Sequence, residues 1–336
     1  MLKLLKQLCN INGPSGAEDM VREFVIKQLE GYAELCVTPL GSVIAKKKRG
    51  PKPQKNIMLD AHIDEVGLII TSITEDGFVR FDCVGGIEPA VMASAKVDVN
   101  GICGVVMSKP VHFLSKDELS KPLSMADLYI DFGTENKEET LKLVKPGDTG
   151  IFCGEFVLFG ECVSAKALDD RVGTAIIIDM LKDDSLPIFT ASFSVQEEIG
   201  QGGAKTSAFI IEPDGAIVLE GTTACDVADI APKNQVCVLG CGPAVSFMDR
   251  LTLYDDKLFN FAINSGLKCQ PKAAVSGGND SGVIHTSLGG VPTVSISVPC
   301  RYIHSPSNVC NVNDIIDTRV LAAKMLEEMA CGELLK

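Results

Sequence analysis

The sequence predicts an α/β protein with a mixed or parallel sheet, into which one β domain is inserted. Two observations carry this prediction. Apolar strand-like runs alternate with helical patterns near the start of the chain and again in its second half. Between these parts, short β-type pieces separated by turn residues show little helical periodicity. The predicted limits are residues 1–68 and 164–336 for the sheet domain and residues 69–163 for the inserted domain.

The first part of the chain contains two predicted helices and three predicted strands. The leucine-rich start MLKLLKQLC is interrupted by lysines, which favours a helix over a signal peptide. Residues 18–30 place Val21, Phe24, Val25 and Leu29 on one helical face. The runs ELCVTP, SVIAKKK and NIMLDAH, separated by glycine and proline, then predict strands.

The inserted region and the second half of the chain differ in their sequence patterns. In the insertion, strands are predicted at FVRFDCV, AKVDVNGICGVVMS, DLYIDFG and GDTGIFCG. After it, DDRVGTAIIIDMLKD predicts a buried helix, and FTASFSVQEE, GAIVLE, KAAVSG and TVSISV predict buried strands. The run VNDIIDTRVLAAKMLEEMA predicts a last helix with Asn313 as its N-cap.

Composition narrows the function classes. The chain has 336 residues, 46% of them hydrophobic and 22% charged, as in soluble globular proteins. Its net charge of -13 disfavours nucleic acid and anionic lipid as partners, and no run approaches the roughly 20 apolar residues of a membrane span. The 13 cysteines form no C-x-x-C pair, which indicates reduced thiols in a cytoplasmic protein.

Acids and histidines gather at or beside the ends of the predicted strands. In an open α/β sheet, ligands bind at the carboxyl ends of strands. Each position has a simple alternative, such as a polar strand end, a helix cap or a loop acid. Together they are harder to explain, because buried like charges repel unless cations neutralise them. The set consists of His62, Asp64, Asp169, Asp170, Glu197, Glu198, Glu220 and His304.

This set fits a dinuclear metal site. Two divalent ions about 3.5–4 Å apart need a bridging carboxylate, terminal ligands and a water between them. Mixed nitrogen and carboxylate ligation favours zinc, cobalt or manganese over calcium or magnesium. In the pair Glu197-Glu198, one side chain could bind metal while the other acts on the water as a general base.

Six blocks of sequence, in this order, resemble the family of tetrahedral, glutamyl and deblocking aminopeptidases. This is metallopeptidase family forty-two, and some of its members are labelled endoglucanases. The blocks are LDAHIDEVG, KALDDRVG, VQEEIG, VLEGTTACD, GGNDSGVIH and VPCRYIHSP, preceded by GPSGAED near the N-terminus. The resemblance implies a mixed-sheet dinuclear metallopeptidase domain of phosphorylase/hydrolase-like fold. It also implies that the insertion is a β-barrel that helps to build dimers and dodecameric tetrahedral shells in the cytoplasm.

The resemblance implies five metal ligands. His62 and Glu220 would be terminal ligands of one ion, and Glu198 and His304 would complete the second. Asp169 would bridge the two ions. The ions would be zinc or cobalt, with manganese as a further option.

Further roles follow from the same resemblance. Asp64 would orient the His62 ring, and Glu197 would be the general base that takes a proton from a water held between the ions. The peptide bond between Asp169 and Asp170 would be cis. The implied reaction is hydrolysis of N-terminal residues from short peptides.

The chain departs from the family pattern in two places. Glu220 stands where many members have aspartate, and EEIGQGG replaces the common EEVGLRG, so that Gln201 and Gly202 take the place of leucine and a basic residue. The sequence also leaves some roles open. Asp280 could contact the site or cap a helix, and Arg301 with Tyr302 could line the pocket or pack at a strand end. His285 is expected to be structural, and His112 a surface or subunit-contact residue.

Other functions stay open as alternatives. A deacylase of N-acyl amino acids would use a similar dinuclear site, and a non-catalytic assembly protein could keep a vestigial one. A glycanase is disfavoured, because a chain with no Trp and few aromatic residues offers little surface for stacking against sugars. The preferred N-terminal residue, the physiological metal and the size of the oligomer are not determined by the sequence.

Overall fold

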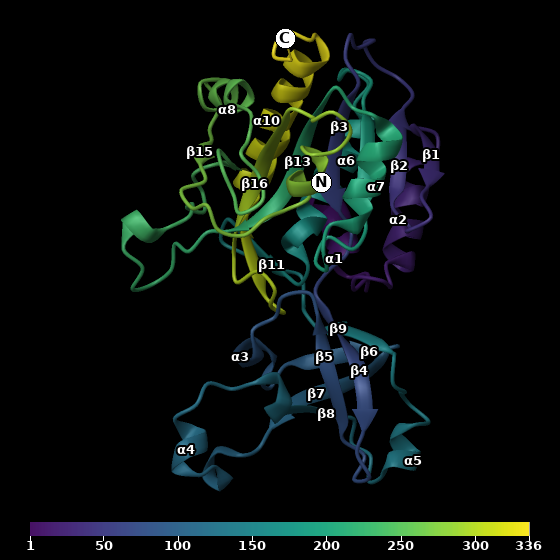
Figure 1. The fold of residues 1–336 in the computed structure, drawn as a ribbon, viewed down its shortest axis with the longest axis vertical. Helices are drawn as coiled ribbons and strands as arrows, with labels where there is room; N and C mark the ends of the chain where they lie inside the picture. The colour runs from purple at the N-terminus through teal and green to yellow at the C-terminus, as the bar shows by residue number, and fades with distance from the viewer. Residues whose placement is uncertain (336) are drawn as a thin grey trace.

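An eleven-stranded mixed sheet with helices on both faces and a closed six-stranded barrel make up the fold (Figure 1). The computed structural model describes residues 1–335. The barrel lies below the sheet domain in Figure 1, and the chain crosses between them twice. This arrangement confirms the predicted α/β fold with one β insertion.

The sheet has the strand order β1-β2-β12-β3-β13-β16-β17-β11-β10, with β14 and β15 beside β16. Its four central strands, β12, β3, β13 and β16, run parallel, so their carboxyl ends meet at one edge. The strands are β1 (Ala33–Val37), β2 (Val43–Lys47), β3 (Ile57–His62), β10 (Val157–Phe159), β11 (Cys162–Ala165), β12 (Thr190–Ser194), β13 (Gly215–Thr223), β14 (Ala244–Val245), β15 (Gln270–Pro271), β16 (Thr293–Arg301) and β17 (Asn308–Asn311).

Helices cover both faces of the sheet. Strand residues alternate between the faces: Leu59 and Leu219 pack in the main core with α6, whereas Met58 and Val218 pack with α7 and α9. Both faces of the central strands are therefore buried, which explains their continuous apolar runs. The helices are α1 (Leu2–Cys9), α2 (Asp19–Leu29), α6 (Leu168–Lys182), α7 (Gly202–Ile211), α8 (Asp256–Ile263), α9 (Ser281–Ile284), α10 (Val312–Ala330) and the 3₁₀ turn Pro232–Asn234.

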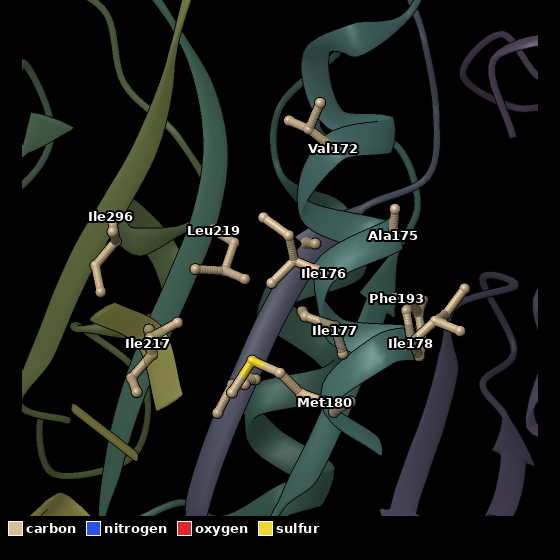
Figure 2. Close-up of a cluster of buried hydrophobic side chains, with 14 of the residues drawn as sticks. Val172, Ala175, Ile176, Ile177, Ile178, Met180, Phe193, Ile217, Leu219 and Ile296 are labelled. Atoms are coloured by element: carbon tan, nitrogen blue, oxygen red, sulfur yellow. The ribbon is translucent and has the colours of Figure 1, made fainter. Parts of the chain in front are cut away.

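Helix α6 is buried along most of its length. Its residues Val172 and Ile176 face the sheet near Leu219 and Ile296 (Figure 2). Helices α1, α2 and α10 pack against it as well. Because α6 is enclosed on several sides, its sequence is apolar nearly all round.

The barrel closes in the order β4-β5-β8-β7-β6-β9. Its first and last strands pair directly, with Leu68 opposite Gly150, so the chain enters and leaves at neighbouring points. Alternate residues such as Leu68, Ile70 and Val97 form a separate core. The strands are β4 (Gly67–Ile73), β5 (Val79–Val84), β6 (Lys96–Val99), β7 (Ile102–Ser108), β8 (Leu128–Asp131) and β9 (Thr149–Phe152). Its loops carry α3 (Pro89–Met92), α4 (Lys116–Leu119), α5 (Lys137–Thr140) and the 3₁₀ turns Val111–Phe113 and Met125–Asp127.

Some details differ from the sequence-based expectations. The predicted insertion 69–163 includes β10 and part of β11, which belong to the large sheet because β11 pairs with β17, Val163 opposite Cys310. We therefore propose that the inserted domain ends near Phe152. The predicted strand KAAVSG is wrong: β15 stops at Pro271, and the residues after it form a loop. The predicted N-cap Asn313 is also wrong, since the side chain of Asn311 accepts the hydrogen bond from the Asn313 N–H.

All 13 cysteines are free thiols. Within residues 1–335, none of the helices has both the length and the apolar content that crossing a membrane requires.

Candidate metal centre and catalytic site

The parallel register of the sheet brings His62 and Glu220 together. Val218 on β13 lies opposite Asp60 on β3. Two residues further along each strand come Glu220 and His62, which point to the same face because side chains alternate along a strand. The nearest nitrogen and oxygen, His62 Nε2 and Glu220 Oε2, are 3.7 Å apart.

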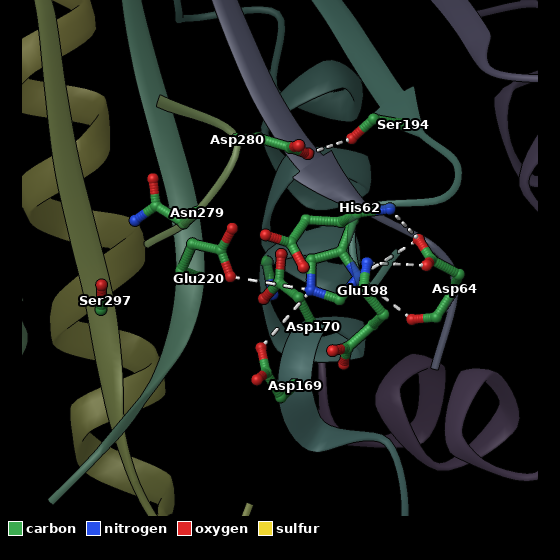
Figure 3. A network of polar contacts seen from close by, with 12 residues as sticks. His62, Asp64, Asp169, Asp170, Ser194, Glu198, Glu220, Asn279, Asp280 and Ser297 are labelled. Atoms are coloured by element: carbon green, nitrogen blue, oxygen red, sulfur yellow. Dashed lines mark hydrogen bonds and ion pairs between the residues drawn. The ribbon is translucent and has the colours of Figure 1, made fainter. Parts of the chain in front are cut away.

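The start of helix α6 supplies Asp169. Asp169 and Asp170 have non-helical backbone angles, and the peptide bond between them is cis, as the resemblance implies. Asp170 accepts a hydrogen bond from the Gly173 N–H at 3.0 Å and so caps the regular helix. Asp169 points away from the helix toward His62 (Figure 3), with 3.5 Å between Asp169 Oδ1 and His62 Nε2. The two adjacent acids thus have different contacts.

Glycine at position 221 allows Asp169 to approach β13. A Cβ atom there would lie 3.0 Å from Asp169 Cβ and 3.1 Å from Asp169 Cα. Both contacts are tighter than side chains normally make. The glycine that follows Glu220 is therefore needed for the close packing of β13 against the start of α6.

Asp64 holds the turn that carries Glu197 and Glu198. The backbone N–H groups of these two residues donate to the Asp64 carboxylate at 3.1 and 3.2 Å. The Ser15 hydroxyl donates to it at 2.6 Å. Burial alone would raise the pKa of Asp64, but the contacts with His62, Ser15 and the Glu197 N–H lower it overall.

Asp64 also contacts the His62 ring. His62 Nδ1 lies 3.1 Å from the backbone oxygen of Asp64 and 3.5 Å from its carboxylate oxygen Oδ1. A proton on Nδ1 would face both oxygens, which leaves Nε2 free to bind a cation.

His304 reaches the site from the loop after β16, with a left-handed φ of 57°. Its Nε2 lies 3.3 Å from Glu198 Oε1 and 3.6 Å from Asp169 Oδ2. Its Nδ1 lies 2.7 Å from the backbone oxygen of Gly86, which follows barrel strand β5. The inserted barrel therefore takes part in orienting a ring of the site.

These residues form two clusters that share Asp169. One consists of His62, Asp169 and Glu220, and the other of Asp169, Glu198 and His304. Ligands about 2.0–2.1 Å from a tetrahedral ion lie about 3.4 Å from one another. The separations of 3.3 to 3.7 Å between nitrogen and oxygen fit that spacing. A third cluster contains His62, Glu197 and Glu198.

Unpaired oxygens give a second test of the fit. Over residues 1–335, the buried atoms Asp169 Oδ1 and Glu220 Oε1 have no hydrogen-bond partner. A buried carboxylate oxygen without a donor is costly unless a cation satisfies it. The donor set therefore fits divalent metal ions.

The electrostatics also favour cations. Burial raises the pKa values of Glu197 and Glu220 well above their ordinary range, although His62 opposes the shift. Burial would lower the pKa of His304, but its contacts with Asp169 and Glu198 raise it to about 11. Without metal, Glu197 and Glu220 thus tend to hold protons and the imidazoles to be charged, whereas contacts with His304 and His62 lower the pKa of Asp169 despite its burial. Bound dications would reverse both tendencies.

The residues with open roles lie outside these clusters. Asp280 makes no side-chain cap within the described chain; it accepts a hydrogen bond from Ser194 at 2.7 Å (Figure 3). Arg301 forms a bidentate ion pair with Asp226, with both distances 2.7 Å. This pair anchors the loop after β13 to the end of β16.

The other two histidines make local contacts. His285 Nδ1 lies 2.7 Å from the Ser281 backbone oxygen, one turn earlier along the chain. His112 is exposed in the barrel loop and packs against the neighbouring Phe113 ring.

Sequence reasoning missed several contacts of the site. Ser15, Gly86 and Gln201 touch Asp64, His304 and the Glu197 side chain, respectively. Ser15 lies in the GPSGAED motif, which was itself a recognisable signal. The contact with Gly86 leaves no such signal, because every residue has a backbone oxygen.

Glu65, which had no predicted role, ties the N-terminal motif to the site. Its carboxylate pairs with Lys166 at 2.7 and 2.9 Å and lies 3.4 Å from Arg171 Nη2. It also accepts the Gly13 N–H at 3.1 Å. We call Glu65, Lys166 and Arg171 the Glu65 cluster.

Comparison with known proteins adds independent findings. A family model described as M42 glutamyl aminopeptidase matches residues 41–321. The chain is 38% identical to a putative aminopeptidase of Acetivibrio thermocellus, over 98% of each chain. It superposes on a TET aminopeptidase from a marine sediment archaeon of the Thaumarchaeota with a TM-score of 0.93, at 31% identity and with 99% and 98% of the two chains covered.

A further solved structure concerns assembly. The TET1 peptidase of Pyrococcus horikoshii, which can assemble into a tetrahedron or a large octahedral shell, matches with a TM-score of 0.82. The identity is 31%, and the match covers 97% of this chain and 98% of that one.

Proposed function

The chain belongs to the M42 glutamyl aminopeptidase family and is a hydrolase acting on peptide bonds, and we propose that it removes N-terminal residues from short peptides with two divalent ions and Glu197 as general base. The observation that carries the proposal is the pair of ligand clusters sharing Asp169, with Glu197 beside them.

We propose that His62, Asp169 and Glu220 hold one ion, and Asp169, Glu198 and His304 the other. Zinc or cobalt fits this mixture of nitrogen and carboxylate ligands best, and manganese also fits. When bound, such ions polarise a carbonyl group and make water more acidic. The spacing of the nitrogens and oxygens and the unpaired oxygens of Asp169 and Glu220 support this assignment.

Glu197 is the proposed base. It lies beside His62 and Glu198 without being needed in either cluster that shares Asp169. Its carboxylate would take a proton from the attacking water and return it to the leaving amine. Burial, which raises its pKa, suits a group that must both accept and donate a proton near neutral pH. Asp64 fixes its backbone and also the His62 ring, which supports a positioning role for Asp64.

The substrate end recognised would be the free α-amine. The site is rich in carboxylates, and the net charge of the chain is -13, so a cationic amine is drawn toward it. We also propose that the chain forms dimers that assemble into a tetrahedral dodecamer, as its similarity to shell-forming TET peptidases suggests. Light scattering tests the assembly. The free thiols support the expected cytoplasmic location.

Changing Glu197 to Gln tests the function. We expect kcat on aminoacyl chromogenic substrates to fall by about 10²–10⁴-fold, while metal content stays the same, because only the proton carrier is lost. Glu30→Gln, on the exposed end of α2, is the matched control and should keep full activity. Near wild-type turnover in the Glu197→Gln variant would contradict the assignment of Glu197 as the general base. Turnover of N-acetyl amino acids, but not of free-amine peptides, would instead support the deacylase.

A further inference from the structure

The side chain of Gln201 lies against the proposed base. It is buried, with 6% of its surface exposed, although glutamine is usually a surface residue. Its Nε2 donates to the Glu197 carboxylate at 3.5 Å. The same nitrogen donates a short hydrogen bond to the backbone oxygen of Asn279. Within residues 1–335, no other side chain forms a hydrogen bond with the Glu197 carboxylate.

The contact with Asn279 determines which end of the amide faces Glu197. A backbone oxygen can only accept, so the nitrogen of the Gln201 amide must point toward it. Asn279 is itself held in place, because its Nδ2 donates to Ser295 at 3.1 Å and its Oδ1 accepts the Ser281 N–H at 2.9 Å. With one N–H used by Asn279, the second N–H of the same nitrogen is available to Glu197.

The backbone brings the two side chains together. Gln201 has a left-handed φ of 62° just before helix α7, and its N–H donates to the Glu197 carbonyl at 3.1 Å. The Gly203 N–H donates to the Val195 carbonyl at 3.0 Å. This tight turn folds position 201 back over position 197 and fixes the distance between them.

We infer that Gln201 is a positioning residue for the reaction: its amide holds the carboxylate of Glu197 in one orientation beside the metal ligands. The inference rests on the proposed function. The pattern EEVGLRG, which the resemblance implies for this segment, has leucine at this position; leucine has no donor, so a chain with that pattern would lack this restraint.

A restraint on the base should affect the chemical step more than substrate binding. We expect Gln201→Met, which keeps the length of the side chain and removes the amide, to lower kcat by about 5- to 20-fold with KM and metal content nearly unchanged. Gly202→Ala is the control for disturbance at the start of α7. A Cβ atom there meets its nearest neighbour only at 3.7 Å, so kcat should not change.

A double-mutant cycle separates positioning from a general structural role. Glu197→Asp shortens the base and withdraws it from the amide, so Gln201→Met should have almost no further effect on kcat in that background. A purely structural role would reduce kcat by the same factor in both backgrounds and would overturn the inference. So would a wild-type kcat in Gln201→Met. If Gln201→Met does not fold, Gln201→Leu takes its place in the cycle, since leucine is the residue of the pattern EEVGLRG at this position.

The two proposals fail in different ways. Near wild-type turnover in Glu197→Gln overturns the proposed function and, with it, the role of Gln201. An inactive Glu197→Gln together with an unchanged kcat in Gln201→Met overturns the role of Gln201 alone.

Discussion

Two clusters of buried charged residues adjoin the end of β3. They differ in how the charge of their carboxylates is compensated. In the Glu65 cluster, one carboxylate meets two cations and a backbone N–H. In the site, the carboxylates outnumber the histidines, and buried oxygens of Asp169 and Glu220 have no hydrogen-bond partner within the described chain. In the first cluster both oxygens of the Glu65 carboxylate have a donor, although Arg171 Nε has no hydrogen-bond partner among the described residues, whereas the second needs added positive charge. Charge compensation therefore distinguishes a structural ion pair from a metal-binding site more clearly than burial does, because both clusters are buried.

Metal removal should have the largest effect and should act on the site alone. We expect dialysis against a chelator to reduce activity below about 1% and to lower Tm by about 5–10 °C, because bound ions stabilise only the folded chain. Zinc or cobalt should restore both. The measurements are metal analysis, turnover and thermal unfolding. Full activity in protein shown to be free of metal would contradict the division between the two clusters.

Glu65→Gln should break the Glu65 cluster. It leaves Lys166 and Arg171 buried with too little negative charge, which costs about 3 kcal/mol or more of unfolding free energy. Chemical denaturation measures this loss. The control is Glu75→Gln: Glu75 pairs with Lys137 at 2.8 Å but is exposed, so its loss should cost less than about 1 kcal/mol. Equal effects of the two variants would show that the Glu65 cluster contributes no more than a surface pair.

Gly221→Ala should disturb the site without removing a ligand. The added methyl group presses on Asp169, so we expect metal affinity and kcat/KM to fall by about 10–100-fold. Competition with a chromogenic chelator measures the affinity. Gly289→Ala is the matched control, because a Cβ atom there has no neighbour within 4 Å among the described residues. Unchanged metal affinity in Gly221→Ala would argue against Asp169 as the shared ligand.

A surface pair gives the smallest expected effect. Hydrogen bonds from Ser185 and Arg319 lower the pKa of Asp183 to about 2. The ionised form is thus favoured in the folded state, so the stabilisation is present above the ordinary pKa near 4 and is lost as pH falls toward 2. Asp183→Asn should cost about 0.5 kcal/mol at pH 6, and the difference from wild type should shrink by pH 3. A difference that grows on acidification would reverse the assigned sign.

The fold could be predicted from the sequence because its periodicities differ along the chain. Buried strands such as GAIVLE and the alternating pieces of the barrel leave distinct patterns. The end of the insertion could not be located, because β10 and β11 look like barrel strands and differ only in their partner, β17. Pairing between distant strands is not encoded in local composition.

The same limit applies to the candidate site. Acids at strand ends could be found because a carboxylate in an apolar setting is unusual. The contact of Gly86 with His304 could not, since it uses a backbone atom of the inserted barrel. Gln201 was noticed only as a departure from the family pattern, and its contact with Glu197 depends on the left-handed turn between them.

The closed barrel also has a consequence for folding order. The chain must bring His62 and Asp169 together across the whole insertion, and closing a long flexible loop costs entropy. In the barrel, however, β4 pairs with β9, so its entrance and exit are hydrogen-bonded neighbours. A barrel that folds first thus turns a long loop into a short one. We expect the inserted region to gain protection from hydrogen exchange before the central strands of the sheet, and so to act as a template on which the two halves of the other domain meet.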